Sequence, residues 1–192
     1  MESLSLPNRP DTQERFFIYD IVSPMDKTFY TQSALEIAPK LLGKYLVRKL
    51  PDGKIIRSKI CEVEAYVGEE DLACHASKGK TARTKIMYEE GGIWYIYLVY
   101  GMYHMLNVVV GKKDDPSAIL IRGVENISGP GRLTKQLEID RLFNSLPISQ
   151  KAGLWVEDGE IIPKNKILTT PRIGVSYAGV WAKKPYRFLI KN

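Results

Sequence analysis

GGIWYIYLVYGMYHMLNVVV, residues 91–110, is the stretch of this 192-residue chain that decides its fold. Aromatic and β-branched residues favour strands over helices, and Gly101-Met102 interrupts the run near its middle. We therefore predict a β-hairpin with tyrosines on and beside its turn. Buried tyrosines usually need a partner for each hydroxyl, so a crowd of them indicates an aromatic platform rather than ordinary core. The aromatic side chains within this stretch are Trp94, Tyr95, Tyr97, Tyr100 and Tyr103.

Two strands are expected before the hairpin. Residues 44–50 and 55–66 have strand composition and are separated by a turn at residues 51–53, Pro-Asp-Gly. Side chains alternate between the two faces of a strand, so Glu64 and Tyr66 should point the same way. The alternation predicts one face that consists of Ile56, Ser58, Ile60, Glu62, Glu64 and Tyr66. Residues 67–90 form a long polar loop, which in a compact domain is usually functional or disordered.

The second half of the chain adds short elements. Residues 117–124, SAILIRGV, are an apolar strand whose one charge, Arg122, needs a partner. Residues 129–131, GPG, lead into a helix, and residues 170–192 contain two more short strands. We predict a single α+β domain over residues 29–192, with a largely antiparallel sheet and flanking helices. Residues 1–28 show no periodicity and are expected to be a loosely ordered lead-in.

Composition limits the class of protein. A hydrophobic content of 44% and a charged content of 26% are typical of a folded soluble protein. The chain has no long apolar run, and residues 1–17 do not resemble a secretory signal, so we expect an intracellular protein with no membrane span. Cys61 and Cys74 are then expected to be reduced thiols. The net charge of +6 is compatible with a nucleic-acid partner, and also with two solvated charged faces.

Motifs for several chemistries are missing from the sequence. It contains no GxGxxG, GxxxxGK[ST] or GxSxG pattern, and its cysteines and histidines match no familiar zinc spacing, so we expect no metal or nucleotide cofactor. The side chains that remain as candidates for a functional site are carboxylates, aromatics and one buried arginine. Glu64 is the best candidate for a general base, because desolvation at the end of an apolar strand raises a carboxylate pKa. Glu62 is its rival.

The residues resemble a known family, the alkyladenine or methylpurine DNA glycosylases of the 3-methyladenine DNA glycosylase type. The matching segments run in the family's order from about Ala34 to Phe188. They are EVEAYVGEEDLACH at 62–75, MYEEGGIWYIYLVYGMYHMLNV at 87–108, ILIRGVE at 119–125, SGPGRL at 128–133 and RIGVSYAGVWAKKPYRF at 172–188. The chain departs from some members at residues 84–88, TKIMY, which leaves the conformation of the 76–90 loop open.

The resemblance implies a fold and an activity. The fold would be one α+β domain with a curved antiparallel sheet and a protruding β-hairpin. The activity would be that of a monofunctional DNA glycosylase, which flips 3-methyladenine, 7-methylguanine, hypoxanthine or ethenoadenine out of duplex DNA and hydrolyses the N-glycosidic bond, starting base excision repair. Such an enzyme needs no metal or cofactor, binds double-stranded DNA through the minor groove and acts as a monomer. It would be cytoplasmic in a bacterium and nuclear in a eukaryote.

The resemblance also implies residue roles. Glu64 would activate the water that attacks C1′, and Arg122 would support that water and the glutamate and contact the target phosphate. Tyr100 would enter the minor groove and fill the gap left by the flipped base. The residues that would hold the base are Tyr66, His75 and Tyr97, which sandwich it, and Asn107, which disfavours the 2-amino group of guanine.

The spacing of two hairpin tyrosines predicts a local irregularity. Tyr97 and Tyr100 are three residues apart and would face opposite sides of a regular strand, so we predict a bend or break in regularity near Tyr100.

Alternatives to a glycosylase remain open from the residues alone. A non-catalytic module could bind damaged nucleic acid with the same aromatic platform. A zinc hydrolase could use Cys61, Cys74, His75 and His104.

Overall fold

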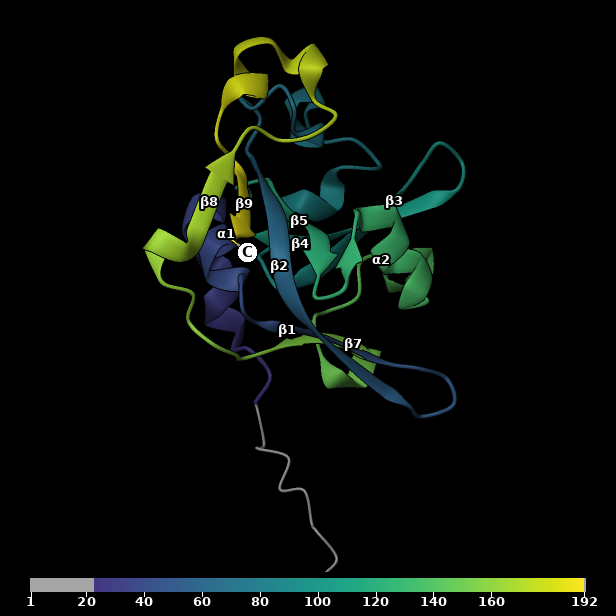
Figure 1. The fold of residues 1–192 in the computed structure, drawn as a ribbon. Coiled ribbons are helices and arrows are strands. Elements are labelled where there is room, and N and C mark those ends of the chain that lie inside the picture. The colour runs from purple at the N-terminus through teal and green to yellow at the C-terminus, as the bar shows by residue number, and fades with distance from the viewer. Residues whose placement is uncertain (1–22, 192) are drawn as a thin grey trace, which may run out of the picture.

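The computed structural model describes residues 23–191, which fold into one α+β domain around a mostly antiparallel nine-stranded sheet (Figure 1). The strand order along the main path is β3-β4-β5-β2-β1-β7, while β6 pairs with β5, and β9 pairs with β2 and β8. The predicted fold class is confirmed. The strands are β1 (Tyr45–Lys49), β2 (Ile55–Val67), β3 (Ile93–Val99), β4 (Tyr103–Val110), β5 (Ser117–Val124), β6 (Ile127–Ser128), β7 (Leu154–Glu157), β8 (Ile167–Thr170) and β9 (Arg187–Ile190).

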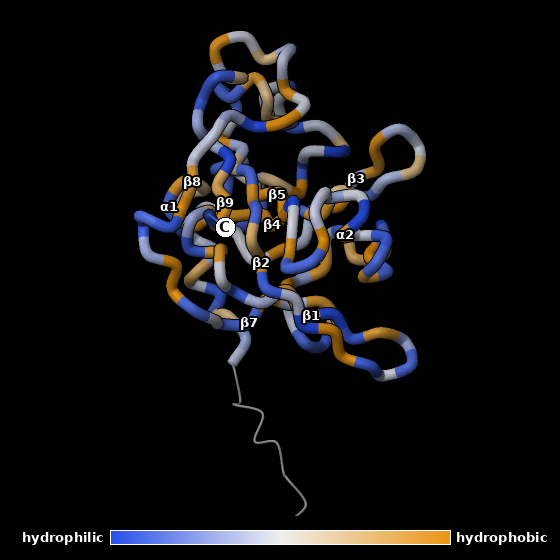
Figure 2. The backbone as a smooth tube through the Cα atoms, viewed as in Figure 1, coloured by the Kyte–Doolittle hydropathy of each residue, from blue (hydrophilic) through white to orange (hydrophobic). Residues whose placement is uncertain are grey.

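Two α-helices cover the core face of this sheet. Helix α1 (Ala34–Leu41) contributes Ile37 and Leu41 to the main core, and helix α2 (Pro130–Gln136) contributes Leu133. Figure 2 shows hydrophobic segments along the central strands β4 and β5. The short 3₁₀ helices are η1 (Lys27–Thr31), η2 (His75–Lys78), η3 (Lys85–Tyr88), η4 (Arg141–Phe143), η5 (Gln150–Ala152), η6 (Lys164–Lys166) and η7 (Ser176–Lys183).

Strand β2 changes the face of its side chains in the middle. Its register against β5 shifts between Ile60 and Val63, as at a β-bulge. Ile60, Val63 and Ala65 consequently all lie in the main core, whereas Glu62 and Glu64 meet Arg122 on the other face. The prediction of one uninterrupted face from residue 56 to residue 66 is therefore wrong at Ile60. Uniform alternation cannot anticipate an extra residue in one strand.

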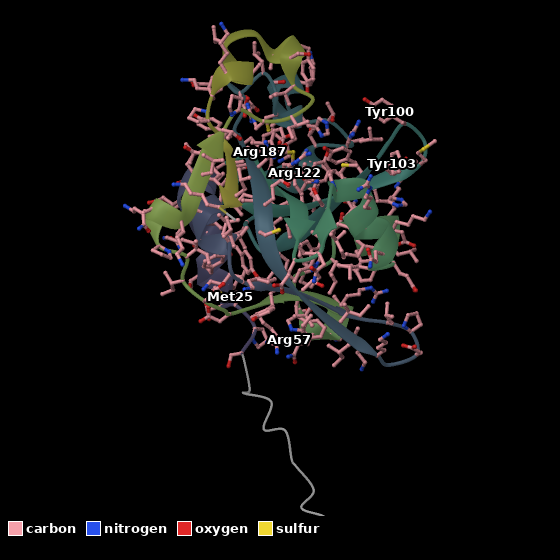
Figure 3. The ribbon with its side chains drawn as sticks, in the orientation of Figure 1. Met25, Arg57, Tyr100, Tyr103, Arg122 and Arg187 are labelled. Carbon is pink, nitrogen blue, oxygen red and sulfur yellow. The ribbon has the colours of Figure 1, made fainter. Side chains whose placement is uncertain are left out.

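The predicted hairpin is formed by β3 and β4, which pair from Ile93–Val109 to Val99–Tyr103. Tyr100 lies in its turn with φ +52°, Gly101 follows with φ +70°, and the Met102 N–H donates to the Val99 carbonyl over 3.2 Å. The predicted irregularity at Tyr100 is confirmed. The turn holds Tyr100 at the tip of the hairpin, 87% exposed (Figure 3).

Helix α2 supports the base of this hairpin. The Thr134 hydroxyl donates to the His104 carbonyl over 2.9 Å. Gly131 lies so close to the Tyr103 ring that a Cβ there would come within 2.7 Å of it, so this position accepts only glycine without rearrangement. The GPG turn therefore serves to bring the helix against the hairpin.

The start of the predicted lead-in, residues 1–22, lies outside the described residues. Pro24 forms an isolated β-bridge with Glu157, and the Met25 N–H donates to the Val156 carbonyl over 2.9 Å. The last residues of the lead-in thus lie against β7. Across residues 23–191, none of the helices has the length and apolar character needed to span a membrane.

Candidate active site

A cleft of about 500 Å³ opens beside the hairpin, where the ends of β2, β3, β4 and β5 meet the 173–177 segment. The structure brings the residues predicted to form the site together here. Glu64, the catalytic candidate, is completely buried, at 0% exposure, and hydrogen-bonds to Tyr66 of the cleft wall. The other six line the cleft: Tyr66, His75, Tyr97, Tyr100, Asn107 and Arg122.

Three donors surround the Glu64 carboxylate. The Tyr66 hydroxyl donates to Oε2 over 2.8 Å, and the Ile173 backbone N–H donates to Oε1 over the same distance. Arg122 Nη1 lies 3.5 Å from Oε1. Burial raises the pKa of Glu64, and it outweighs the lowering effects of the Arg122 charge and the two hydrogen bonds. A carboxylate that is oriented on both oxygens and has a raised proton affinity is suited to accept a proton from water.

Glu62 has a different environment from Glu64. Its Oε1 accepts hydrogen bonds from Arg122 Nε at 3.0 Å and from Arg187 Nε at 2.6 Å, so it is engaged by two guanidinium groups. Arg122 and Arg187 are labelled in Figure 3. Glu62 thereby anchors Arg122 beside Glu64 and supplies the partner that the charge within β5 requires. Both guanidinium groups bind Glu62 Oε1, so this carboxylate has a structural role in holding the two arginines, and the geometry favours Glu64 over its rival as the general base.

The aromatic residues form one continuous wall of the cleft. The His75 and Tyr97 ring centroids are 4.6 Å apart with an interplanar angle of 68°, and Tyr95 lies 5.3 Å from Tyr97. A flat base between two rings needs about 7 Å, twice a carbon–carbon contact distance. No base therefore fits between His75 and Tyr97, and these two form a single wall that lines the same cleft as Tyr66.

His75 is neutral at neutral pH. Burial and the neighbouring Arg83 charge lower its pKa from 6.5 to about 4. Its Nδ1 lies 2.8 Å from the Tyr95 hydroxyl, which fixes the ring. Burial also raises the pKa of Tyr66 and of Tyr97, so both phenols stay protonated. The ring side chains of His75, Tyr66 and Tyr97 are consequently uncharged at neutral pH.

Replacement of His75 by glutamine should make the protein less sensitive to acid. With a pKa of about 4 in the folded state against 6.5 unfolded, only the unfolded chain takes up a proton as the pH falls between these values. The free energy of unfolding of the unmodified protein should therefore fall more between pH 7 and pH 5 than that of His75→Gln. Urea unfolding at both pH values measures the difference, with His104→Gln as the matched control. Equal losses in the unmodified protein and His75→Gln would contradict the lowered pKa.

Asn107 is held rigidly at the base of the cleft. It is 2% exposed, and its Nδ2 donates to the carbonyls of Tyr95 and Met105, each over 3.1 Å. Both amide hydrogens are committed to the main chain. The side chain therefore cannot turn aside to accommodate an additional group on a bound base.

Residues that the sequence reasoning missed complete the site. Arg83 lies over the Tyr97 ring, 4.9 Å from its centroid, and it comes from the 76–90 loop whose conformation was left open. Thr84 organises that loop: its hydroxyl donates to the Gly79 carbonyl and accepts the Thr81 N–H, both over 2.7 Å. The Ile173 amide that binds Glu64 was missed because every non-proline residue carries the same backbone donor.

The cysteine and histidine side chains do not assemble a metal site in the described part of the chain. No group of three or more His, Cys, Asp or Glu residues there is arranged to hold a metal ion. Cys61 and Cys74 are both free thiols.

Comparison with known proteins identifies the family. A sequence model described as methylpurine-DNA glycosylase matches residues 28–129 and 125–192. A protein of Methanocella arvoryzae is 44% identical over 188 residues, which cover 88% of this chain and 92% of the relative. A Myxococcus xanthus protein is 40% identical, covering 88% and 90% respectively. Both carry the name "Putative 3-methyladenine DNA glycosylase". The chain belongs to the methylpurine-DNA glycosylase family.

As a methylpurine-DNA glycosylase, the protein is an enzyme that hydrolyses N-glycosyl bonds in DNA, and it serves DNA repair. The family resemblance seen in the sequence is confirmed over most of the chain. Of the alternatives left open by the residues, a non-catalytic binding module and a zinc hydrolase are both set aside, and DNA is the partner.

Proposed function

We propose that this methylpurine-DNA glycosylase removes alkylated and deaminated purines with a water molecule activated by Glu64. The substrate class comprises 3-methyladenine, 7-methylguanine, hypoxanthine and ethenoadenine, and the enzyme uses neither a metal nor a cofactor. The observation that supports this most strongly is the buried Glu64 carboxylate, hydrogen-bonded on both oxygens behind an aromatic cleft.

The proposed chemistry is a hydrolytic displacement at C1′. Glu64 takes a proton from water, the water oxygen bonds to C1′, and the C1′–N9 bond breaks with its electron pair going to the purine. A purine alkylated at N3 or N7 is cationic and leaves as a neutral molecule, so one carboxylate suffices where glycoside hydrolysis generally uses two. Hypoxanthine and ethenoadenine are neutral in DNA, so each would leave as an anion that then takes a proton from solvent. Arg122 is anchored by Glu62 and lies 3.5 Å from Glu64 Oε1, which supports a role in steadying the carboxylate. In the proposed complex it would also contact the target phosphate.

The cleft supports recognition of a flipped base. The base would stack between Tyr66 and the wall made by His75 and Tyr97, where neutral aromatic faces attract a cation by about 0.5–2 kcal/mol. Base–aromatic stacking contributes about 1–3 kcal/mol per base, enough to offset an extrusion cost of a few kcal/mol. The immobile Asn107 amide would exclude the 2-amino group of guanine by steric conflict.

The hairpin tip supports the proposed approach to DNA. Tyr100 is held at the tip by a turn, is 87% exposed and also lines the cleft. In this position it would enter the minor groove and occupy the gap in the base stack, as wedge residues do in proteins that bind this groove. The cleft is complete within one chain, so the enzyme would act as a monomer.

An excision assay tests the proposal. The purified protein is incubated with duplex oligonucleotides that carry a single hypoxanthine, 1,N6-ethenoadenine or 3-methyladenine, and strand cleavage is measured with and without alkali. A monofunctional glycosylase should give cleavage only after alkali, and none with unmodified adenine. Binding to damaged DNA without formation of abasic sites would overturn the proposal.

A further inference from the structure

The most completely buried ion pair in the described part of the chain lies behind the cleft, between Arg172 and Asp71. Both side chains are 0% exposed. Arg172 Nη1 lies 2.5 Å from Asp71 Oδ2, and Nη2 lies 2.8 Å from Oδ1, so the pair is bidentate. Burying two charges carries a large desolvation cost, and apolar residues of similar volume are often at least as stabilising. Stability alone is therefore a weak reason for this pair.

The pair joins three separate segments of the chain. Asp71 also accepts the N–H groups of Val67 and Ala73, over 3.1 and 3.0 Å, which fixes the turn that follows β2. Arg172 also donates to the Ala65 carbonyl over 2.8 Å, within β2, and to a carbonyl in η7 over 3.2 Å. Figure 1 shows the result, with the yellow segment that contains η7 lying over the loop after β2.

Both hydrogen-bond donors that orient Glu64 depend on the Arg172–Asp71 ion pair. Ile173, whose N–H donates to Glu64 Oε1, is the residue after Arg172 in the chain. Tyr66, whose hydroxyl donates to Oε2, has the Arg172 guanidinium 4.8 Å from its ring centroid. The ring of Tyr186 lies at 5.3 Å from the same guanidinium. A displacement of Arg172 would therefore move the Ile173 amide and release the Tyr66 ring together.

We propose that Arg172 and Asp71 are positioning residues that orient the Glu64 carboxylate by holding the Ile173 amide and the Tyr66 ring against it. The inference rests on the proposed role of Glu64 as the general base. Neither Arg172 nor Asp71 lines the cleft, so the pair acts through other residues rather than on the substrate.

Substitution of Arg172 by lysine distinguishes the hydrogen bonds by which Arg172 positions its neighbours from its positive charge. Lysine keeps the positive charge beside Asp71 but cannot reproduce the planar fork that reaches Ala65 and η7. Loss of a backbone donor should raise the pKa of Glu64 further and so move its titration midpoint to higher pH, because hydrogen bonds to the charged form favour that form. The titration midpoint of Glu64 is measured by ¹³C NMR on glutamate-labelled protein, with the resonance assigned by its disappearance in Glu64→Gln.

The control is Lys44→Met, which breaks the ion pair between Lys44 and Asp158, remote from the cleft. It should lower the melting temperature without moving the Glu64 midpoint. If Arg172→Lys also lowers the melting temperature but leaves the midpoint in place, the pair is only structural and the proposal is overturned. If Arg172→Lys does not fold, Asp71→Glu is the second variant. It keeps both charges of the ion pair but displaces Arg172, and it should move the Glu64 titration midpoint in the same direction. An unmoved midpoint in Asp71→Glu would likewise overturn the proposal.

Excision rates on hypoxanthine duplex complete the experiment. The single-turnover rate at neutral pH should fall about tenfold in Arg172→Lys, with the acid limb of its pH profile moved to higher pH and DNA affinity unchanged. The NMR titration is independent of activity. Absence of excision in the unmodified protein would therefore count against the proposed function, whereas an unmoved Glu64 midpoint would count against the positioning role.

Discussion

Glu64→Gln should lower the single-turnover rate of base excision by a factor of about 10²–10⁴, the range contributed by general base catalysis. Glutamine has nearly the same shape as glutamate: its one oxygen can accept the Ile173 N–H while its NH2 group donates to the Tyr66 hydroxyl oxygen. It cannot, however, take a proton from water. The substitution also removes a negative charge from a site that binds DNA. Affinity for damaged duplex should therefore be unchanged or higher while excision is lost.

Glu70→Gln is the matched control, because Glu70 is an exposed acid that follows the same strand. Excision of hypoxanthine under enzyme excess, followed through alkali-labile sites, and binding measured by fluorescence anisotropy together check the prediction. Full excision by Glu64→Gln would refute the assignment of the base, and the equivalent test of Glu62→Gln would then decide whether its neighbour carries that role.

Tyr100→Ala should lower excision from duplex DNA by about 5–150-fold, corresponding to the loss of about 1–3 kcal/mol of stacking in the vacated position. The effect should disappear on a single-stranded substrate, because no base stack then has to be refilled. Stability should be unaffected, since the Tyr100 side chain is 87% exposed. The substitution is therefore expected to affect base flipping and not the chemical step.

Rates on duplex and single-stranded hypoxanthine oligonucleotides measure this difference directly. Ile161→Ala is the control, because Ile161 is also highly exposed, at 88%, and does not line the cleft. An equal loss of activity on both substrates would place Tyr100 in base binding or catalysis and would contradict a role as a wedge.

The sequence alone determined the features that depend on neighbouring residues or on motifs. Aromatic and β-branched composition with a Gly-Met interruption predicted the hairpin, and the three-residue spacing of Tyr97 and Tyr100 predicted its irregular turn, found at φ +52° for Tyr100. Local alternation correctly placed Glu64 and Tyr66 on one face, where they are hydrogen-bonded. The lone charge in an apolar strand correctly indicated that Arg122 has a partner.

The tertiary structure decided which segments that are distant in the sequence contact one another. The bulge in β2 places Ile60 in the core and separates it from Glu62 and Glu64, and it depends on the pairing of β2 with β5. The amide that binds Glu64 belongs to Ile173, 109 residues away, and Asp71 is 101 residues from Arg172. Periodicity and spacing describe only what happens within an element. Hydrogen-bond partners, burial and the resulting pKa shifts arise when distant segments meet, and for that reason only the folded chain defines them.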